Sequence, residues 1–261
     1  MPVRDVTYPP IIAACKLGFR ALGQDIRITG AHHVPRSGGV LLACNHIGYV
    51  DFVYGGLAAN PSGRKVRFMA KRELFDHRLA GPLMRSLHHI EVDRADGEAS
   101  LRTAVGYLKA GEAVGIFPEA TISRALELKE LKTGAVRIAA EAGVPLVPVI
   151  LWGTQRMMTK DHPRDFSRGK TITLSIGTPM HPDGADPVAD TLELQRVMDS
   201  MLDEAIRSYP AAEQPDGSWW LPKRYGGSAP SLEEAAELDA KEKADRAARR
   251  AARDRSAPPT S

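Results

Sequence analysis

Along this chain, short apolar runs alternate with longer stretches in which apolar residues recur at the spacing of an α-helix. The apolar runs predict strands at 26–28, 40–44, 66–70, 89–92, 113–117, 147–152 and 171–176. The periodic stretches predict helices at 51–59, 73–87, 98–110, 133–142 and 191–209. Alternating strands and helices are typical of an α/β fold. We therefore predict a single α/β domain with a central mixed, largely parallel sheet flanked by helices.

The N-terminal residues 9–22 predict an amphipathic helix outside this alternation. It combines apolar and basic side chains, namely Ile11, Ile12, Leu17 and Phe19 with Lys16 and Arg20. Such a helix can lie in a membrane surface, or it can pack its apolar face on its own domain. No apolar run approaches the roughly 18–20 residues that cross a bilayer, so we expect membrane contact without a span. We assign residues 1–24 to this helix and 25–209 to the α/β domain.

The C-terminal residues 210–261 differ from the domain in composition. The segment 210–230 is rich in Pro, Gly and Ser and carries Trp219 and Trp220 in its middle. Adjacent tryptophans suit a membrane interface, or they can dock the tail onto the domain. The segment 231–253 mixes Ala with charges of both signs, which predicts a solvated helix, and 256–261 should be disordered. We expect this part to be an appendage and not part of the catalytic machinery.

Composition narrows the class of protein. The 261 residues are 43% hydrophobic, which is enough for a buried core. The formal net charge of +3 is modest, and no basic stripe is interleaved with aromatics, so we expect no nucleic-acid partner. Cys15 and Cys44 have no metal-ligand spacing and favour two reduced thiols. Nothing in the sequence calls for a metal or an organic cofactor.

The strongest chemical signal follows the apolar run 40–44. There the segment NHIGYVD, residues 45–51, places His46 and Asp51 five positions apart where a strand gives way to a helix. Within one continuous helix such residues lie about 140° apart and cannot meet. With His46 in the turn before the helix, Asp51 can reach back to it. An imidazole held by a carboxylate is a ready general base.

A second pair with the same spacing, His88 and Asp93, gives a comparison within the chain. It lies in a segment that predicts a strand, where residues an odd number apart point to opposite faces. The spacing alone is a weak signal, so the context of the first pair carries the hypothesis.

A third polar segment follows the predicted strand 113–117. Here FPEATIS, residues 117–123, brings Glu119 and Thr121 to a strand end, which is where open α/β sheets build their sites. In order along the chain, NHIGYVD, Arg94, FPEATIS and VPLVPV (residues 144–149) resemble the four blocks of the glycerolipid acyltransferase family, which makes phosphatidic acid from lysophosphatidic acid. The resemblance covers about residues 30–179.

The resemblance implies an O-acyltransferase of phospholipid biosynthesis. Its donor would be acyl-CoA or acyl-carrier protein, and its acceptor lysophosphatidic acid or a related glycerophosphate. Such an enzyme would work as a peripheral protein on the cytoplasmic side of the cell membrane. The resemblance assigns Glu119 to acceptor binding, and we expect Thr121 beside it to hydrogen-bond the acceptor's glycerol.

One departure from the family pattern concerns the acceptor's phosphate. The third block usually reads FPEGTRS, and its arginine is assigned to the phosphate, whereas this chain has Ile122 at that position and Ala120 in place of the glycine. Arg94 and Lys71 are candidates for the phosphate because both are cationic and closely follow predicted strands. Arg124, two residues beyond Ile122, is a third candidate. The acceptor can also differ from the usual one.

The chemistry needs few groups. A thioester already carries an activated carbonyl, so transfer to a hydroxyl chiefly needs a base for that hydroxyl and stabilisation of the oxyanion. His46 would take the proton and later protonate the leaving thiolate, while Asp51 would orient it. Two alternatives remain: acylation of glycerol 3-phosphate or another lysolipid or glycolipid by the same chemistry, and a non-catalytic lipid-binding protein.

Overall fold

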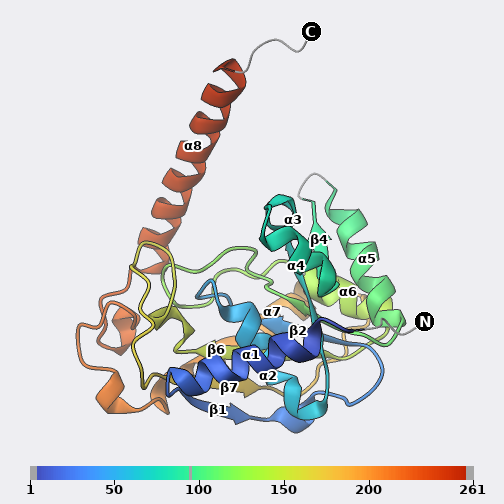
Figure 1. The fold of residues 1–261 in the computed structure, drawn as a ribbon, viewed down its shortest axis with the longest axis horizontal. Helices are drawn as coiled ribbons and strands as arrows, with labels where there is room; N and C mark the ends of the chain where they lie inside the picture. Colours follow the sequence, from blue (N-terminus) through green and yellow to red (C-terminus); the bar gives the residue numbers. More distant parts are fainter. Residues whose placement is uncertain (1–4, 94–95, 257–261) are drawn as a thin grey trace.

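The computed structural model describes residues 5–93 and 96–256, with side chains described up to residue 249. It confirms the predicted α/β fold, with seven strands in one mixed sheet in the order β1-β7-β6-β2-β5-β3-β4 (Figure 1). The strands are β1 (Asp25–Thr29), β2 (Val40–Cys44), β3 (Val66–Lys71), β4 (Ile90–Val92), β5 (Ala113–Ile116), β6 (Leu146–Trp152) and β7 (Thr171–Ile176). All neighbouring strands pair parallel except β6 and β7, which pair antiparallel.

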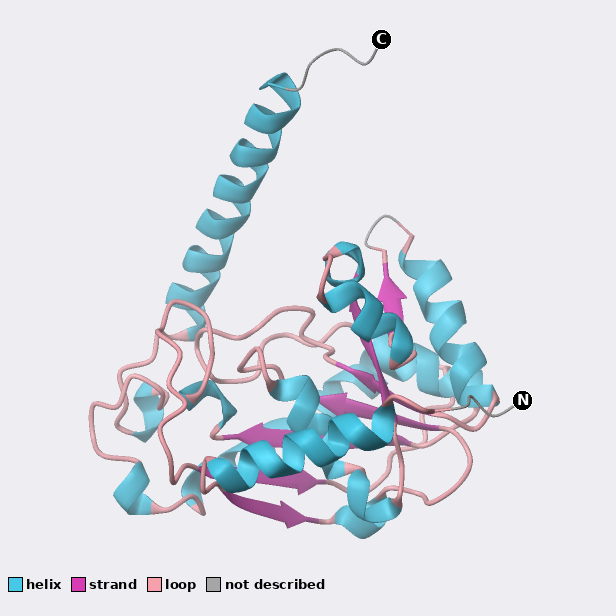
Figure 2. Ribbon diagram, viewed as in Figure 1, coloured by secondary structure: helices cyan, strands magenta, loops and turns pink. Residues whose placement is uncertain are grey.

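Helices cover both faces of the sheet (Figure 2). One layer contains α1 (Tyr8–Ala21) and α2 (Asp51–Ala58), and the other contains α5 (Gly97–Lys109), α6 (Gly134–Ala142) and α7 (Pro187–Arg207). The remaining helices are α3 (Arg72–Asp76), α4 (Ala80–Ser86) and α8 (Leu232–Ser256). This arrangement makes a three-layer sandwich in which the central strands are buried on both faces.

The central position of strand β2 in the sheet explains why its sequence is apolar throughout. All five of its residues are fully buried, because helices cover both faces of the sheet at this position. Leu41 and Ala43 belong to the core on the side of α5, α6 and α7, whereas Leu42 and Cys44 belong to the core on the side of α2. Because β2 lies in the centre of the sheet, the chain that follows Cys44 leaves the sheet at the carboxyl end of a central strand.

The helix predicted at 73–87 is wrong as one piece. The chain forms α3 and α4, which are separated at His77, where the backbone is extended. Pro82 accounts for the break, because a proline inside a continuous helix clashes with the carbonyl four residues earlier. His77 Nδ1 accepts the backbone N–H groups of Leu79 and Ala80 and so stabilises the start of α4.

Helix α7 begins earlier than the predicted 191–209. Asp186 caps it, since its side chain accepts the N–H groups of Val188 and Ala189, and Pro187 occupies the first helical position. This Asp-Pro pair is a start signal that the apolar spacing alone did not reveal.

The tail contains the predicted charged helix, observed as α8. It starts with a capping box, in which Ser231 and Glu234 exchange hydrogen bonds between side chain and backbone. Trp219 and Trp220 dock the tail onto the domain: Trp219 stacks on His162 at 3.7 Å between ring centroids, and Trp220 is only 8% exposed. Of the two alternatives for these tryptophans, the docking one is therefore observed.

The charged helix is not solvated along its whole length. Arg124, Lys129 and Lys160 of the domain pair with its acidic residues Asp239 and Glu242. Farther along, α8 extends away from the domain (Figure 1). Within the described residues, no helix combines the length and the apolar character needed to cross a membrane.

Candidate active site

Three neighbouring strands deliver polar residues to the same edge of the sheet. β6, β2 and β5 lie side by side and run parallel, so their carboxyl ends meet at one edge. His46 follows β2, Glu119 follows β5, and Thr154 follows β6. Asn45 ties two of these ends together, because its buried side-chain amide exchanges hydrogen bonds with the backbone of Leu151 at 2.7 and 3.0 Å. The site therefore rests on strands that are buried along their whole length, β2 and β6.

His46 and Asp51 meet as the spacing predicted. His46 Nδ1 lies 3.0 Å from Asp51 Oδ2, and Asp51 is the first residue of α2. His46 itself lies in the loop before the helix and not at its cap, which is Val50. The loop lets Asp51 reach back across five positions, which a continuous helix would prevent.

The surroundings of Asp51 fix the tautomer of His46. Asp51 Oδ2 also accepts the backbone N–H groups of Ile47 and Gly48, each at 2.7 Å, and Oδ1 accepts the Thr154 hydroxyl at 2.6 Å. Since the carboxylate is an acceptor, Nδ1 of His46 must carry the proton, which leaves the lone pair on Nε2. The Asp51 side chain is fully buried, whereas that of His46 is 20% exposed. The imidazole can therefore meet a substrate while its partner stays fixed.

Two contributors to this geometry were missed by the sequence reasoning. Thr154 lies 103 residues from Asp51, at the start of a short 3-10 helix (Thr154–Arg156), and no local pattern links them. Gly48 sits so close to its neighbours that a Cβ there would lie 3.0 Å from Met158 O and 3.3 Å from Asp51 Oδ1. Glycine lets the loop pack against the carboxylate.

Glu119 supports the His46 backbone. Its Oε1 accepts the N–H of His46 at 2.7 Å, and its Oε2 accepts the N–H of Lys129 at 3.1 Å. The residue is 4% exposed. Burial raises the pKa of the Glu119 carboxyl to about 8, although its two backbone hydrogen bonds act in the opposite direction. These contacts make Glu119 a positioning residue for His46; its assignment to acceptor binding stays a prediction.

We predict that Glu119 makes the free energy of unfolding depend on pH. Its folded-state pKa of about 8 lies above the ordinary value of 4.5, so the folded protein holds a proton that the unfolded chain has lost. This contribution is complete below the ordinary pKa and is lost as the pH rises towards 8, at up to about 1.4 kcal/mol per pH unit. We expect the stability difference between the native protein and Glu119→Gln to shrink over this range. Urea unfolding of both proteins at several pH values measures it, and a constant difference would contradict it.

The structure places the other residues predicted to bind the acceptor, the phosphate candidates and Thr121, in different surroundings. Arg94 lies outside the described residues. Lys71 ends β3, in register with Val92 of β4, and is partly buried. Thr121 accepts a hydrogen bond from Lys160 Nζ at 3.2 Å. Arg124 is 7% exposed and pairs with Asp161, Asp239 and Glu242.

Ile122, at the position of the usual family arginine, is 4% exposed. An arginine there would be buried, so Ile122→Arg would test the cost of burying a charge and not only acceptor binding. Cations bonded to this segment or next to it include Arg124, which follows it, Lys129, whose N–H is bonded to Glu119, and Lys160, whose Nζ is bonded to Thr121. Lys129 and Lys160 were not among the residues predicted from the sequence.

The comparison pair, His88 and Asp93, does not form the same arrangement. His88 has a left-handed backbone with φ of 53° and lies in a turn before β4. The Asp93 carboxylate pairs with Arg72. The predicted reason was wrong, because β4 is limited to Ile90–Val92 and neither His88 nor Asp93 lies in a strand; the turn at His88 and the ion pair of Asp93 distinguish this copy instead.

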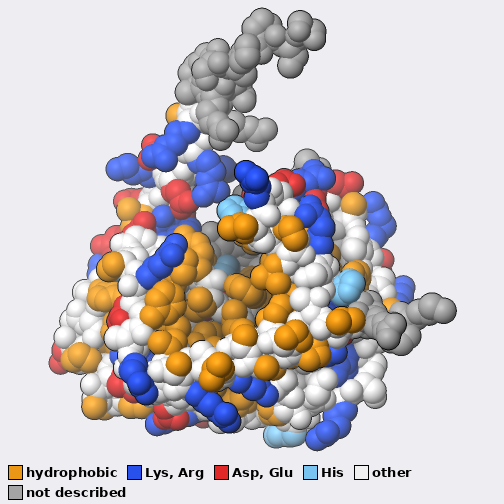
Figure 3. Space-filling view, in the orientation of Figure 1, with side chains coloured by type: hydrophobic (Ala, Val, Ile, Leu, Met, Phe, Trp, Pro, Cys, Tyr) orange, Lys and Arg blue, Asp and Glu red, His pale blue; other side chains and the backbone are white. Residues whose placement is uncertain are grey.

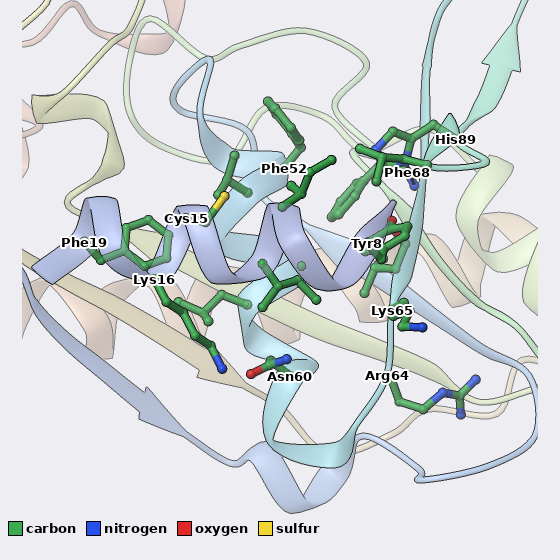
Figure 4. Close-up of a pocket in the computed structure, with 17 residues that line it drawn as sticks. Tyr8, Cys15, Lys16, Phe19, Phe52, Asn60, Arg64, Lys65, Phe68 and His89 are labelled. Carbon is green, nitrogen blue, oxygen red and sulfur yellow. Dashed lines mark hydrogen bonds between the residues drawn. The ribbon is translucent and has the colours of Figure 1, made fainter. Parts of the chain in front are cut away.

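An apolar cavity lies beside the His46 loop. It is bounded by Ile12, Cys15 and Phe19 of α1, by Phe52 and Gly56 of α2, and by Phe68 of β3 (Figure 4). Aromatic rings connect it to the site, since Phe68 stacks on Phe117 at 5.4 Å and Phe117 stacks on His46 at 4.2 Å. On this side of the molecule, hydrophobic side chains gather around a hollow over α1 (Figure 3).

Helix α1 therefore has a structural role. Its inner residues wall the cavity and Tyr8 is buried, which matches the packing alternative for this helix. Its outer surface still exposes Leu17, at 69%.

Among the described residues, no group of three or more His, Cys, Asp or Glu side chains is arranged to hold a metal ion.

Comparisons with known proteins identify relatives of this chain. Residues 25–152 match the family described as Acyltransferase. The chain is 36% identical over 162 residues to the 1-acyl-sn-glycerol-3-phosphate acyltransferase of Bacillus subtilis, covering 62% of this chain and 76% of that protein. It is 30% identical to the protein of the same name from Limnanthes douglasii, covering 75% and 67%. The crystal structure of the 1-acyl-sn-glycerophosphate (LPA) acyltransferase PlsC from Thermotoga maritima is similar, with a TM-score of 0.65, 25% identity and coverage of 77% and 80%.

Proposed function

The chain belongs to the acyltransferase family and is an O-acyltransferase, and from this premise we propose that it acylates the free hydroxyl of lysophosphatidic acid to form phosphatidic acid. The contact between His46 Nδ1 and Asp51 Oδ2 carries the proposal. A buried carboxylate that fixes one imidazole nitrogen and leaves the other open is the arrangement that acyl transfer to a hydroxyl requires.

The reaction proceeds in two steps at His46. Nε2 removes the proton from the acceptor hydroxyl while its oxygen attacks the carbonyl carbon of the acyl thioester, acyl-CoA or acyl-carrier protein. The tetrahedral intermediate then collapses, the carbon–sulfur bond breaks, and the imidazolium returns the proton to the thiolate. Asp51 stabilises the imidazolium between these steps, because its carboxylate stays hydrogen-bonded to Nδ1. No covalent acyl-enzyme is needed, since the thioester is already activated.

The cavity beneath α1 suits the acyl chain. Its lining is largely apolar, and the rings of Phe68 and Phe117 lead from it to His46. Placing the chain there removes apolar surface from water, which favours binding. The thioester carbonyl would then lie at the cavity mouth near His46.

We expect Gly56→Leu to shorten the acyl chains that the protein uses. A Cβ at Gly56 would lie 4.0 Å from Phe68, so it fits, and the rest of the leucine would enter the cavity. Since each methylene of misfit costs roughly 1–3 kcal/mol, kcat/KM for long-chain donors should fall about tenfold or more relative to short-chain donors. Steady-state assays with a series of acyl-CoA donors measure the ratio.

Gly106→Leu is the matched control. Gly106 also lies within a helix, α5, but it is exposed and a Cβ there meets nothing within 4 Å. It should leave the chain-length profile unchanged. Equal profiles for Gly56→Leu and the native protein would exclude the cavity as the acyl site.

The acceptor is the less constrained substrate. The apolar, buried Ile122 at the family's arginine position favours a second candidate, the acylation of glycerol 3-phosphate or of another lysolipid or glycolipid. The chemistry at His46 is the same for all of these acceptors. The difference lies in the groups that hold the phosphate.

We propose that the protein meets its lipid substrates on the cytoplasmic surface of the membrane. The exposed side chains of Leu17, Tyr49 and Phe52 support this, because they lie on α1 and around the His46 loop. Deleting residues 1–22 would not test the idea cleanly, since α1 also walls the cavity.

One assay tests the proposed function. The purified protein receives acyl-CoA or acyl-carrier protein donors with lysophosphatidic acid, glycerol 3-phosphate or other lysolipids, in anionic vesicles and as short-chain soluble analogues. Fastest transfer to vesicle-borne lysophosphatidic acid, with the product identified as phosphatidic acid, is expected. Faster transfer to another acceptor would favour the second candidate, and no transfer to any acceptor would reject the proposal.

A further inference from the structure

Three cations of the domain converge on the first half of α8. Arg124, Lys129 and Lys160, here called the basic trio, have side chains that are 7%, 24% and 11% exposed. Each of them pairs with Asp239, which is one residue of a helix more than 75 positions away along the sequence. Such convergence concentrates positive charge at one place.

The segments that carry the basic trio are bonded to the His46 loop. Ser123, before Arg124, donates its backbone N–H to His46 O at 2.8 Å. Thr159, before Lys160, donates its hydroxyl to Ile47 O at 2.7 Å. The N–H of Lys129 is bonded to Glu119, whose side chain also holds the His46 backbone. The trio therefore lies next to the proposed catalytic pair.

Two of the three carboxylates that pair with the basic trio belong to α8, where Glu242 also pairs with Arg246. Among the described side chains, the basic trio faces Asp161 of the domain and Asp239 and Glu242 of α8. Without the two acidic residues of α8, three cations would face one carboxylate, and two positive charges would remain. A phosphate monoester carries close to two negative charges at neutral pH.

Helix α8 contacts the domain through these ion pairs and buries little apolar surface. Among its described side chains only Ala235 is buried, whereas Leu232 and Leu238 are 46% and 42% exposed. Residues 243–249 are all exposed, and α8 extends away from the domain (Figure 1). Since a competing anion can replace a carboxylate in a charge-assisted hydrogen bond, α8 can be displaced without uncovering a large apolar core.

We propose that the basic trio binds the phosphate of the acceptor, and that Asp239 and Glu242 of α8 occupy this site in the structure described here. The proposal rests on the proposed function, and it makes α8 an internal competitor of the acceptor. It also accounts for Ile122, because the positive charge missing from that position is supplied by residues that flank the same segment. Thr121 lies between Glu119 and Arg124 along the chain, and its hydroxyl accepts a hydrogen bond from Lys160 of the basic trio.

The test compares two double variants of the full chain. D239A/E242A removes the carboxylates that pair with the basic trio. E233A/E237A is the matched control, because it removes the same charge from exposed positions of the same helix. Calorimetry measures binding of glycerol 3-phosphate, which carries the phosphate without an acyl chain. We expect D239A/E242A to bind it about tenfold more tightly than the native protein and than E233A/E237A, because an internal competitor lowers apparent affinity.

A second pair of variants assigns the binding to the basic trio. In the D239A/E242A background, K129M and K160M should each remove most of the gained affinity. The proposal is overturned if D239A/E242A binds no more tightly than E233A/E237A, or if the lysine variants leave the gain intact. These binding results do not depend on turnover. A protein that binds as expected but acylates no glycerophosphate would disprove the proposed function and leave an anion site gated by α8.

Discussion

Replacing His46 with alanine is expected to lower acyl transfer roughly 10²–10⁴-fold, the usual effect of losing a general base. The loss should fall towards the upper end, because the same imidazole would protonate the leaving thiolate. The fold should survive, since Asp51 keeps its hydrogen bonds from Ile47, Gly48 and Thr154 when the ring is gone. Single-turnover kinetics measure the rate, and circular dichroism with urea unfolding checks the fold.

His88→Ala is the matched control for this prediction. His88 has the same five-residue spacing to an aspartate, but it lies in the turn before β4, and the Asp93 carboxylate pairs with Arg72. We expect its substitution to leave most of the transfer rate. A large loss in His88→Ala together with a small loss in His46→Ala would reverse the assignment of the base.

The order of elements along the chain was predictable because the sheet is buried on both faces. Strands such as β2 must then be apolar at every position, and such runs are visible without knowledge of the partners. The parallel carboxyl edge follows from the same alternation of strands and helices, and it brings His46 and Glu119 together. Where one proline decided the local structure, as Pro82 in the first turn of α4 did for the break between α3 and α4, the signal was present and was outweighed by the apolar spacing.

What the sequence could not reveal are contacts between distant polar residues. Thr154 is hydrogen-bonded to Asp51, 103 positions away in the sequence, and Lys129 forms an ion pair with Asp239, 110 positions away. Charged side chains on a solvated helix carry no pattern that specifies a partner, so the segment 231–253 predicted a helix and not its docking site. The tryptophans of the tail were equally compatible with a membrane and with the domain until Trp220 was seen to be buried.

Replacing Asp51 with asparagine is expected to lower kcat roughly 10–10²-fold, because a charge-assisted hydrogen bond to the imidazolium becomes a neutral one. The tautomer should be preserved. Oδ2 of Asp51 faces two backbone N–H groups, so an amide nitrogen cannot occupy that position without opposing donors. The amide oxygen must therefore lie there, while the amide nitrogen donates to the Thr154 hydroxyl, which can accept.

This reasoning separates two causes of a lower rate. An asparagine that turned its nitrogen towards His46 would impose the wrong tautomer, and such a misplacement has cost about 10⁴-fold in a serine protease triad. Nitrogen NMR of the imidazole distinguishes the cases, and we expect the proton on Nδ1 in both the native protein and Asp51→Asn. Asp190→Asn is the control, because Asp190 also lies in the first turn of a helix, α7, far along the chain from His46. A 10⁴-fold loss with the proton moved to Nε2 would show that the backbone donors of Ile47 and Gly48 do not hold the amide, and that the loop rearranges when the carboxylate is lost.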